Sequence, residues 1–254
     1  MSRKKIQRQT ALLEQLAVSP TMRVNALAQL FAVTTETIRR DLEELAEQGM
    51  ISRTYGGAVI RQALEPVVSE RHKLYLAERS RIAQAAIGQL QDARVIMMGS
   101  GATTAEVARQ MARQLNDKTV ITHAFGVAKA LASNPSMEII MAPGSYHEGE
   151  AATHGAMTQR FLSQYQADVA VLGASGLDVD GCSDALMDAA EVYKSMVQQS
   201  SRVVLVADHS KFDRVALARW CGWSQLDCVI SDRQPELPLQ QRIEQSRADF
   251  VLAP

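Results

Sequence analysis

The chain has 254 residues, of which 46% are hydrophobic and 22% charged, and its formal net charge is −1. These values are ordinary for a folded soluble protein with one large domain, or a small domain and a medium one. No apolar run reaches the length of a membrane span, and the basic N-terminus continues into an amphipathic pattern, unlike a signal peptide. The three cysteines lack paired spacing, so we expect free thiols in the cytoplasm and neither a disulfide framework nor a zinc site.

The small net charge hides a difference between two parts of the chain. Residues 1–61 hold nine Lys and Arg against six Asp and Glu, whereas the remaining residues hold eighteen against twenty-two. A basic module on an acidic body fits nucleic-acid binding by one end of the chain only.

An amphipathic helix is predicted from Val33 to Leu45. Ile38, Leu42 and Leu45 recur at helical spacing and form one apolar stripe, and the threonines before them can cap the helix. A shorter helical pattern at 24–31 precedes this helix across a short turn, and a Gly-Gly hairpin at 51–60 follows it. Helix, turn, helix and β-wing in this order are typical of a winged helix-turn-helix domain of the α+β class that binds DNA.

Charge along this helix predicts which end contacts DNA. Glu43, Glu44 and Glu47 lie in its C-terminal half, where phosphates would repel them, whereas its first turns are basic and hydroxyl-rich. We expect Arg39 or Arg40 to pair with a guanine edge. The predicted DNA-binding residues are Thr34, Thr35, Thr37, Arg39, Arg40, Arg53 and Tyr55, with backbone contacts from Arg3, Lys4, Lys5 and Arg8. The alternative is a small helical cap whose arginines are only solvated surface.

A charged stretch without clear periodicity separates this module from the rest of the chain. We place the DNA-binding domain at 1–61, a linker at 62–78 and a second domain at 79–254. Short apolar strands alternate with helical patterns in the second domain, which predicts an open, mostly parallel α/β sheet covered on both faces. The predicted strands are 94–98, 119–122, 137–142, 168–173, 202–207, 227–231 and 249–252, and the predicted helices are 79–90, 105–115, 126–132, 155–165 and 185–199.

Polar and small residues follow four of these strands. The first strand ends in a glycine-rich turn that runs into a helix, an arrangement that suits an anion such as phosphate. Because ligands of open α/β sheets gather at the carboxyl ends of the strands, we expect these residues to form one effector site. The predicted effector-binding residues are Ser100, Gly101, Ala102, Thr103, Thr104, Thr122, His123, Gly144, Asp208 and Lys211.

The same residues can also have purely structural roles. The turn can serve only strand–helix packing, Lys211 can be a surface lysine, and His123 can be a hydrogen-bonded structural histidine. The turn lacks the third glycine of a dinucleotide fingerprint and the Gly-Lys-Ser/Thr of a nucleotide P-loop, so no nucleotide cofactor is predicted. The segment 177–181 has two aspartates near a glycine but too few ligands for a calcium loop, so we interpret it as a turn and predict no metal.

Two signatures in this sequence resemble the DeoR family of bacterial transcriptional regulators. Residues 37–42 with 53–58 are similar to the family's helix-turn-helix and wing, and residues 172–176 with 208–212 are similar to its effector-domain signature. The resemblance covers essentially the whole chain. It implies a C-terminal domain similar to ribose phosphate isomerase that senses a phosphorylated sugar or polyol. It also implies a homodimer or homotetramer that represses a carbohydrate-use operon.

The chain departs from the family pattern at the strand ends. The departures are Gly99 for aspartate, Ala102 for a hydroxyl residue, His123 for asparagine, Pro143 for glycine and, in the wing, Tyr55 for histidine. Because a carboxylate is lost and an imidazole is gained, we expect the site to form hydrogen bonds with different hydroxyl groups of an effector.

We therefore expect a ligand-controlled, DNA-binding regulator without catalytic residues. The rival hypothesis is a sugar-phosphate isomerase with an appended DNA-binding domain, since a carboxylate could serve as general base. The carboxylates available for that role are Asp178, Asp180, Asp184, Glu191 and Asp208. A purely architectural DNA-binding protein is the third possibility, although it would have no use for an effector site.

Overall fold

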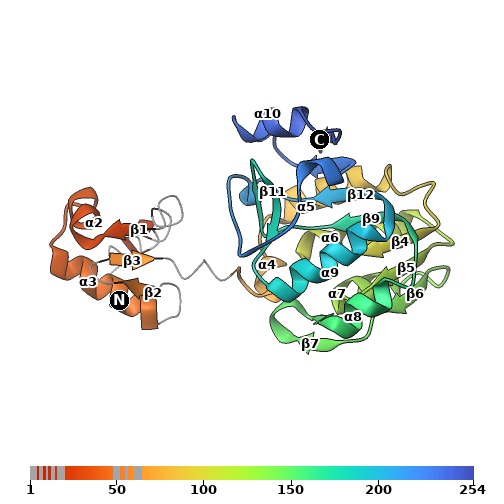
Figure 1. The fold of residues 1–254 in the computed structure, drawn as a ribbon, viewed down its shortest axis with the longest axis horizontal. Helices are drawn as coiled ribbons and strands as arrows, with labels where there is room; N and C mark the ends of the chain where they lie inside the picture. Colours follow the sequence, from red (N-terminus) through yellow and green to blue (C-terminus); the bar gives the residue numbers. More distant parts are fainter. Residues whose placement is uncertain are drawn as a thin grey trace. The chain divides into compact units, whose positions relative to one another are not determined.

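The computed structural model describes residues 5, 8, 9, 11, 12, 15, 21–47, 52–54, 57–59 and 65–254. The chain divides into two compact units, residues 1–65 and 66–254, which we describe separately (Figure 1). No helix in the described ranges is both long and apolar enough to cross a membrane.

The elements whose bounds are described in the first unit are two helices and a small antiparallel sheet. Its elements are β1 (Thr21–Arg23), α2 (Val24–Leu30), α3 (Thr35–Glu47), β2 (Ser52–Thr54) and β3 (Gly57–Val59), with strand order β1-β3-β2. Ile38, Leu42 and Leu45 are buried on one side of α3 and pack against α2 and Leu12. The predicted helices, apolar stripe and hairpin are confirmed; β1 adds a strand that the sequence analysis did not predict.

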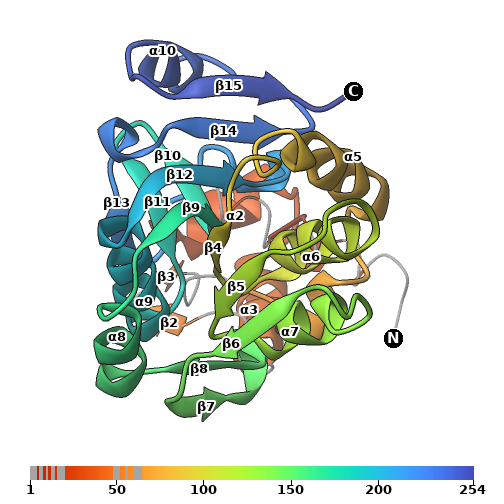
Figure 2. The same cartoon turned by 90° about the vertical axis from the view of Figure 1, so that its right-hand side faces the viewer.

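The second unit is built on a seven-stranded sheet in the order β15-β14-β12-β9-β4-β5-β6 (Figure 2). All pairings within this sheet are parallel, which confirms the predicted α/β class. The strands are β4 (Val95–Met98), β5 (Thr119–Thr122), β6 (Glu138–Met141), β9 (Ala167–Leu172), β12 (Ser200–Val206), β14 (Cys228–Ser231) and β15 (Asp249–Leu252), each at a predicted position.

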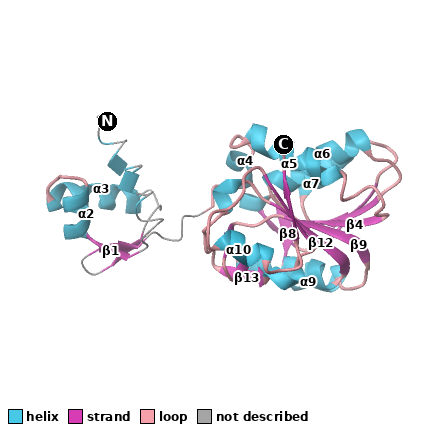
Figure 3. Ribbon diagram, turned by 90° about the horizontal axis from the view of Figure 1, so that it is seen from above, coloured by secondary structure: helices cyan, strands magenta, loops and turns pink. Residues whose placement is uncertain are grey.

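Helices cover both faces of this sheet, as Figure 3 shows with the sheet between them. They are α4 (Val68–Arg71), α5 (Leu76–Ile87), α6 (Ala102–Gln114), α7 (Phe125–Leu131), α8 (Ala156–Leu162), α9 (Met187–Gln198) and α10 (Leu239–Glu244). Strand β4 contributes to both layers: Ile96 and Met98 pack with α5, α6 and α7, whereas Met97 packs on the side of α9. A strand with two buried faces explains the continuous apolar runs in the sequence.

Two small antiparallel elements were not predicted. One is a sheet of β10 (Gly176–Asp178), β11 (Gly181–Asp184) and β13 (Ala218–Cys221); the other is a hairpin of β7 (Ser145–His147) and β8 (Ala152–His154). Three short 3-10 helices, η1 (Glu148–Glu150), η2 (His209–Lys211) and η3 (Trp223–Gln225), also lie in this unit. The segment 177–181 forms the tip of the β10–β11 hairpin, with its turn at 179–180.

The predicted linker is too long at its C-terminal end. The second unit begins at Pro66, and residues 66–78 form α4, a short turn and the start of α5. Val68 and Arg71 of α4 are buried. A helix of four residues is too short to show periodicity, and a buried arginine looks like a surface residue in a sequence, so this segment resembles a linker until its contacts are known.

Candidate DNA-binding surface and strand-end site

Of the predicted DNA-binding residues at α3, Thr34, Arg39 and Arg40 are exposed, whereas Thr35 and Thr37 are partly buried. Thr34 caps the helix, because its Oγ1 accepts a hydrogen bond of 3.2 Å from the backbone N–H of Thr37. Arg39 and Arg40 are exposed, whereas Ile38 and Leu42 are buried. Arg39 lies 3.9 Å from Glu36 with both side chains mostly in water, an ion pair too weak to hold the guanidinium in place.

Two of the predicted backbone contacts are instead engaged within the unit. Arg8 donates two hydrogen bonds to the buried carboxylate of Asp41, at 2.5 and 3.2 Å. Lys5 lies 2.5 Å from Glu44, and this hydrogen bond lowers the pKa of the Glu44 carboxyl. These pairs hold the N-terminal segment against α3, so Lys5 and Arg8 neutralise carboxylates of the helix rather than being unpaired cations.

The remaining predicted DNA contacts fall outside the described residues. Arg53 lies in β2, but its side chain is not described, and the same holds for the whole of Tyr55, Arg3 and Lys4. Their roles remain predictions.

In the second unit, the glycine-rich turn after β4 is held by two buried side chains. The backbone N–H of Ser100 donates to Nε2 of His123 at 3.1 Å. The Tyr193 hydroxyl donates to the Ser100 carbonyl at 2.8 Å, and the Ser100 hydroxyl lies 3.1 Å from the same phenol oxygen. All three polar groups of Ser100 are therefore occupied by protein atoms.

These contacts fix the protonation of His123. Nε2 accepts the Ser100 N–H and must carry a lone pair, so Nδ1 carries the proton and donates to the carbonyl of Thr153 at 2.7 Å. Complete burial is the main reason that the pKa of His123 is lowered from 6.5 to about 3. His123 is a neutral imidazole that joins the end of β5 to the turn after β4 and to β8.

Gly99 and Tyr193 depend on each other. A Cβ atom at position 99 would lie 2.8 Å from Cε1 of Tyr193 and 3.1 Å from Cδ2 of Leu172. The tyrosine ring thus fills the space in which a side chain at position 99 would begin. A side chain at position 99, such as an aspartate, would therefore require the Tyr193 ring of α9 to move.

Several hydroxyl groups predicted to contact an effector bind the backbone instead. Thr122 Oγ1 donates to the Met98 carbonyl at 2.8 Å and accepts the Ala124 N–H at 3.1 Å. Thr104 Oγ1 donates to the Gly101 carbonyl at 3.0 Å. The backbone N–H groups of Ala102, Thr103 and Thr104, at the start of α6, have no partner within the helix. These groups are available to a ligand.

Gly144 has a steric role after β6. A Cβ atom there would collide with Thr158 Oγ1 and lie 2.7 Å from the carbonyl oxygen of His154. Gly144 lets this loop pass close to the start of α8, where Thr158 donates to the Pro143 carbonyl at 2.8 Å.

Asp208, at the end of β12, is fully buried and paired. Arg79 from α5 approaches one carboxylate oxygen, with Nε at 3.2 Å and a terminal nitrogen at 3.1 Å, and the Ser210 N–H donates to the other at 3.2 Å. Lys211 lies next to it in η2. The strand ends therefore gather the predicted residues, but Ser100, Thr122 and Asp208 make contacts within the protein, and an effector-binding role for them stays a prediction.

Three residues of this site were not predicted from the sequence: Tyr193, Arg79 and His154. His154 ends β8, and its ring centroid lies 5.3 Å from that of His123. Burial first and the neighbouring His147 second lower its pKa to about 4, and its buried Nε2 has no hydrogen-bond partner among the described residues. Nothing in the local sequence distinguishes these residues, because their partners lie far away in the chain.

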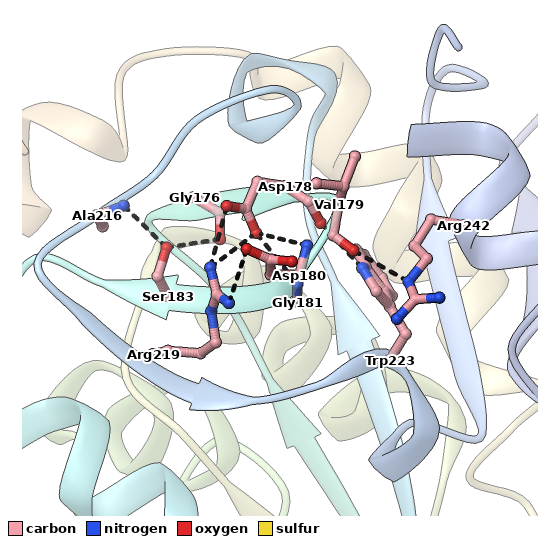
Figure 4. A network of polar contacts seen from close by, with 10 residues as sticks. All are labelled: Gly176, Asp178, Val179, Asp180, Gly181, Ser183, Ala216, Arg219, Trp223 and Arg242. Atoms are coloured by element: carbon pink, nitrogen blue, oxygen red, sulfur yellow. Dashed lines mark hydrogen bonds and ion pairs between the residues drawn. The ribbon is translucent and has the colours of Figure 1, made fainter. Parts of the chain in front are cut away.

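The carboxylates of the β10–β11 hairpin belong to a separate network (Figure 4). Arg219 of β13 lies 3.0 Å from Asp178 and 3.2 Å from Asp180, and Trp223 Nε1 donates to the Asp178 carbonyl at 2.9 Å. Arg219 therefore pairs with the carboxylates of both aspartates of the hairpin. Within the described ranges no three His, Cys, Asp or Glu side chains are grouped so that they could hold a metal ion.

The contact between Gly99 and Tyr193 predicts a coupled effect on stability. We expect Gly99→Ala to lower the free energy of unfolding by about 1–3 kcal/mol, because the added methyl group overlaps the ring. In a Tyr193→Ala background the same change should cost clearly less. Urea unfolding of the four proteins measures the coupling. Gly88→Ala, where the nearest atom is 3.7 Å away, is the control; an equal cost of Gly99→Ala in both backgrounds would contradict the proposed contact.

The buried histidines predict a loss of stability in mild acid. Since the pKa values of His123 and His154 are lowered in the folded state, the unfolded chain binds more protons as the pH falls below 6.5. Each such histidine costs about 1.4 kcal/mol per pH unit in that range. The difference in unfolding free energy between about pH 7.5 and about pH 5 should therefore shrink by about 2 kcal/mol in His123→Asn. His147→Asn should shrink the difference much less, because it removes only the contribution of His147 to the lowered pKa of His154. Equal differences in the wild type and both variants would show that His123 is not buried in its neutral form.

The comparisons with known proteins cover both units. The model described as the DeoR-like helix-turn-helix domain matches residues 8–63, and that described as the DeoR C terminal sensor domain matches residues 75–233. The glycerol-3-phosphate regulon repressor of Escherichia coli K12 is 32% identical over 94% of this chain and 95% of its own length. The HTH-type transcriptional repressor CsqR of the same organism is 30% identical, over 96% and 94%.

Among solved structures, ribose 5-phosphate isomerase A from Neisseria gonorrhoeae has a TM-score of 0.39 at 17% identity, over 54% of this chain and 53% of that chain. Both domain models match in order, and repressors align with this chain along nearly their full length. The chain therefore belongs to the DeoR family of transcriptional regulators.

Proposed function

We propose that this protein is a repressor that binds operator DNA through α3 and releases it in response to a phosphorylated sugar or polyol. The observation that carries the proposal is the exposed basic first half of α3, in a chain whose relatives are named repressors over nearly their full length. One of these relatives is named for a glycerol-3-phosphate regulon, which supports an effector of that chemical class.

DNA contact by the first half of α3 follows from its charges. Arg39 and Arg40 are exposed near the N-terminal end of the helix, whose dipole also favours phosphate. Glu43 and Glu44 lie further along the helix, where Glu44 pairs with Lys5, so the exposed arginines of α3 lie in its first half. We propose that Arg39 or Arg40 reads a guanine in the major groove and that Thr34, Thr35 and Thr37 bind phosphate or a thymine methyl group.

The effector would occupy the carboxyl ends of the strands. The backbone N–H groups at the start of α6 and the ammonium of Lys211 are the groups we assign to its phosphate. Asp208 and Thr122 then act as supports, since their oxygens are already hydrogen-bonded. The same pairing argues for a sensor rather than an isomerase, because Asp208 bound to Arg79 and Asp178 bound to Arg219 are poorly suited to abstract a proton.

Operators of such a protein would be paired half-sites. We propose that the protein is a homodimer or homotetramer in the cytoplasm. Two copies of the first unit would then bind one operator together. The effector would favour the arrangement of these copies that binds DNA less tightly.

Removal of either arginine should weaken operator binding. For a DNA duplex selected from a random library by the wild-type protein, we expect Arg39→Ala or Arg40→Ala to cost about 1–3 kcal/mol, which is a loss of affinity of about 5- to 150-fold. Arg113→Ala, at an exposed arginine of α6, is the matched control and should bind like the wild type. Unchanged affinity in gel-shift titrations of both α3 variants would refute the assignment of this helix.

A thermal-shift screen of the full chain tests the effector class. The panel contains sugar phosphates, polyol phosphates, their unphosphorylated parents and inorganic phosphate. A true effector at ~100 times its dissociation constant should stabilise the folded state by about 2.7 kcal/mol. For a unit of this size that is a shift of roughly 5–10 °C. A shift that needs both the phosphate and the sugar supports the proposal; conversion of a panel compound by the protein would favour the isomerase instead, and no shift from any compound would overturn the effector class.

A further inference from the structure

The second unit begins with residues 66–79, here called the connecting segment, and two buried arginines pair this segment with loops at the strand ends. Residues 66–79 contain α4, a turn and the first residues of α5. Arg71, at the end of α4, pairs with Glu150 of η1, and both side chains are largely buried. Arg79, in the first turns of α5, pairs with Asp208 before η2. The start of the second unit thus contacts two loops at the carboxyl edge of the sheet.

Arg79 also ties the connecting segment to itself. One terminal nitrogen of its guanidinium donates to the carbonyl of Leu74 at 2.8 Å and to the carbonyl of Arg71. The same guanidinium lies 5.9 Å from the ring centroid of Tyr75, which makes an edge contact with His209 at 5.3 Å. One buried cation therefore holds the turn after α4, the start of α5 and the loop that contains Lys211.

The partner loops are attached to Lys211, to which we assign the effector phosphate, and to His123, which holds the turn before α6. η2 contains Lys211 and follows Asp208 directly. η1 lies between β7 and β8, and Thr153 of β8 donates its N–H to the His123 carbonyl at 2.9 Å and accepts from His123 Nδ1. A ligand that moves Lys211 or the end of β5 would therefore act on both ion pairs through short, buried contacts.

We propose that the pairs Arg71–Glu150 and Arg79–Asp208 form a latch that fixes where the chain leaves the second unit, and that effector binding opens it. This inference rests on the proposed repressor function. When the latch is closed, the chain that links the two units ends at Pro66. When the latch is open, residues 66–75 also become part of that link, which is then longer. In an oligomer, a longer connection lowers the effective concentration of one DNA-binding unit at its half-site once the other is bound, which weakens operator binding without changing a DNA contact.

The first test breaks the pair Arg71–Glu150, because Asp208 of the other pair directly precedes η2, which contains Lys211. We expect Glu150→Gln without ligand to bind the selected duplex at least tenfold more weakly than the wild type. Glu70→Gln is the matched control, since it removes the same charge from an exposed pair of α4 with Lys73 and should change affinity less than twofold. Hydrogen exchange should rise at residues 66–79 in the first variant and not in the second.

The second test locks the latch without removing a buried charge. A Cβ atom at Gly149 would lie 3.5 Å from Cγ1 of Val67, so Val67→Cys with Gly149→Cys places two thiols within reach of each other. The native cysteines are buried, which leaves the new pair to form the disulfide. We expect the oxidised variant to bind the duplex within twofold of the wild type and to keep that affinity when the phosphorylated panel is added as a pool. Reduction with dithiothreitol should restore the response to the pool.

The outcomes distinguish a failure of the latch from a failure of the proposed repressor function. If the pool does not change DNA binding by the wild type, the proposed effector has failed, while the ligand-free comparison of Glu150→Gln with Glu70→Gln still decides whether the latch sets DNA affinity. Equal affinities of those two variants would overturn the latch, and so would an oxidised variant that responds to the pool or cannot bind DNA. If Glu150→Gln does not fold, the reversible lock decides alone.

Discussion

The neutral imidazole of His123 joins three segments that meet at the carboxyl edge of the sheet. Its Nε2 accepts from the turn after β4, its ring belongs to the end of β5, and its Nδ1 donates to β8. Each of these groups is buried, and a buried polar group without a partner costs far more than a hydrogen bond contributes. These contacts form only while His123 is neutral and protonated at Nδ1. The position of β8, and with it that of the η1 loop and the connecting segment, therefore depends on this ring.

At the strand ends, the space beside Gly99 and the polar groups of Ser100 are both taken up by the same tyrosine side chain. An aspartate at position 99 would place a charged side chain where the Tyr193 ring lies, and the tyrosine in turn occupies the hydroxyl and carbonyl of Ser100. His123 occupies the remaining N–H of that residue. Because the polar groups of Ser100 are occupied, the groups that remain for the proposed effector phosphate include the first N–H groups of α6.

Most of the framework follows from periodicity in the sequence. The stripe of Ile38, Leu42 and Leu45 and the apolar strands were predictable because both faces of a buried strand, or one face of a helix, impose a repeated pattern. The four-residue helix α4 and the strands of the minor sheets are too short to do so. The strand-end residues were located, but their partners were not. Tyr193 lies 93 residues from Ser100, and Arg79 lies 129 residues from Asp208, so only the fold reveals that their polar groups are already paired.

The most direct measurement of this account is the tautomer of His123. A long-range ¹H–¹⁵N correlation spectrum of protein labelled with ¹⁵N in the histidine rings, recorded at about pH 7, reports which ring nitrogen carries the proton, and the signal is assigned by its absence in His123→Asn. We predict a neutral ring protonated at Nδ1, unchanged on acidification to about pH 5, because the pKa is lowered to about 3. A ring protonated at Nε2, or at both nitrogens, could not accept the Ser100 N–H and would contradict the structure of the site on which the proposed sensor and latch depend.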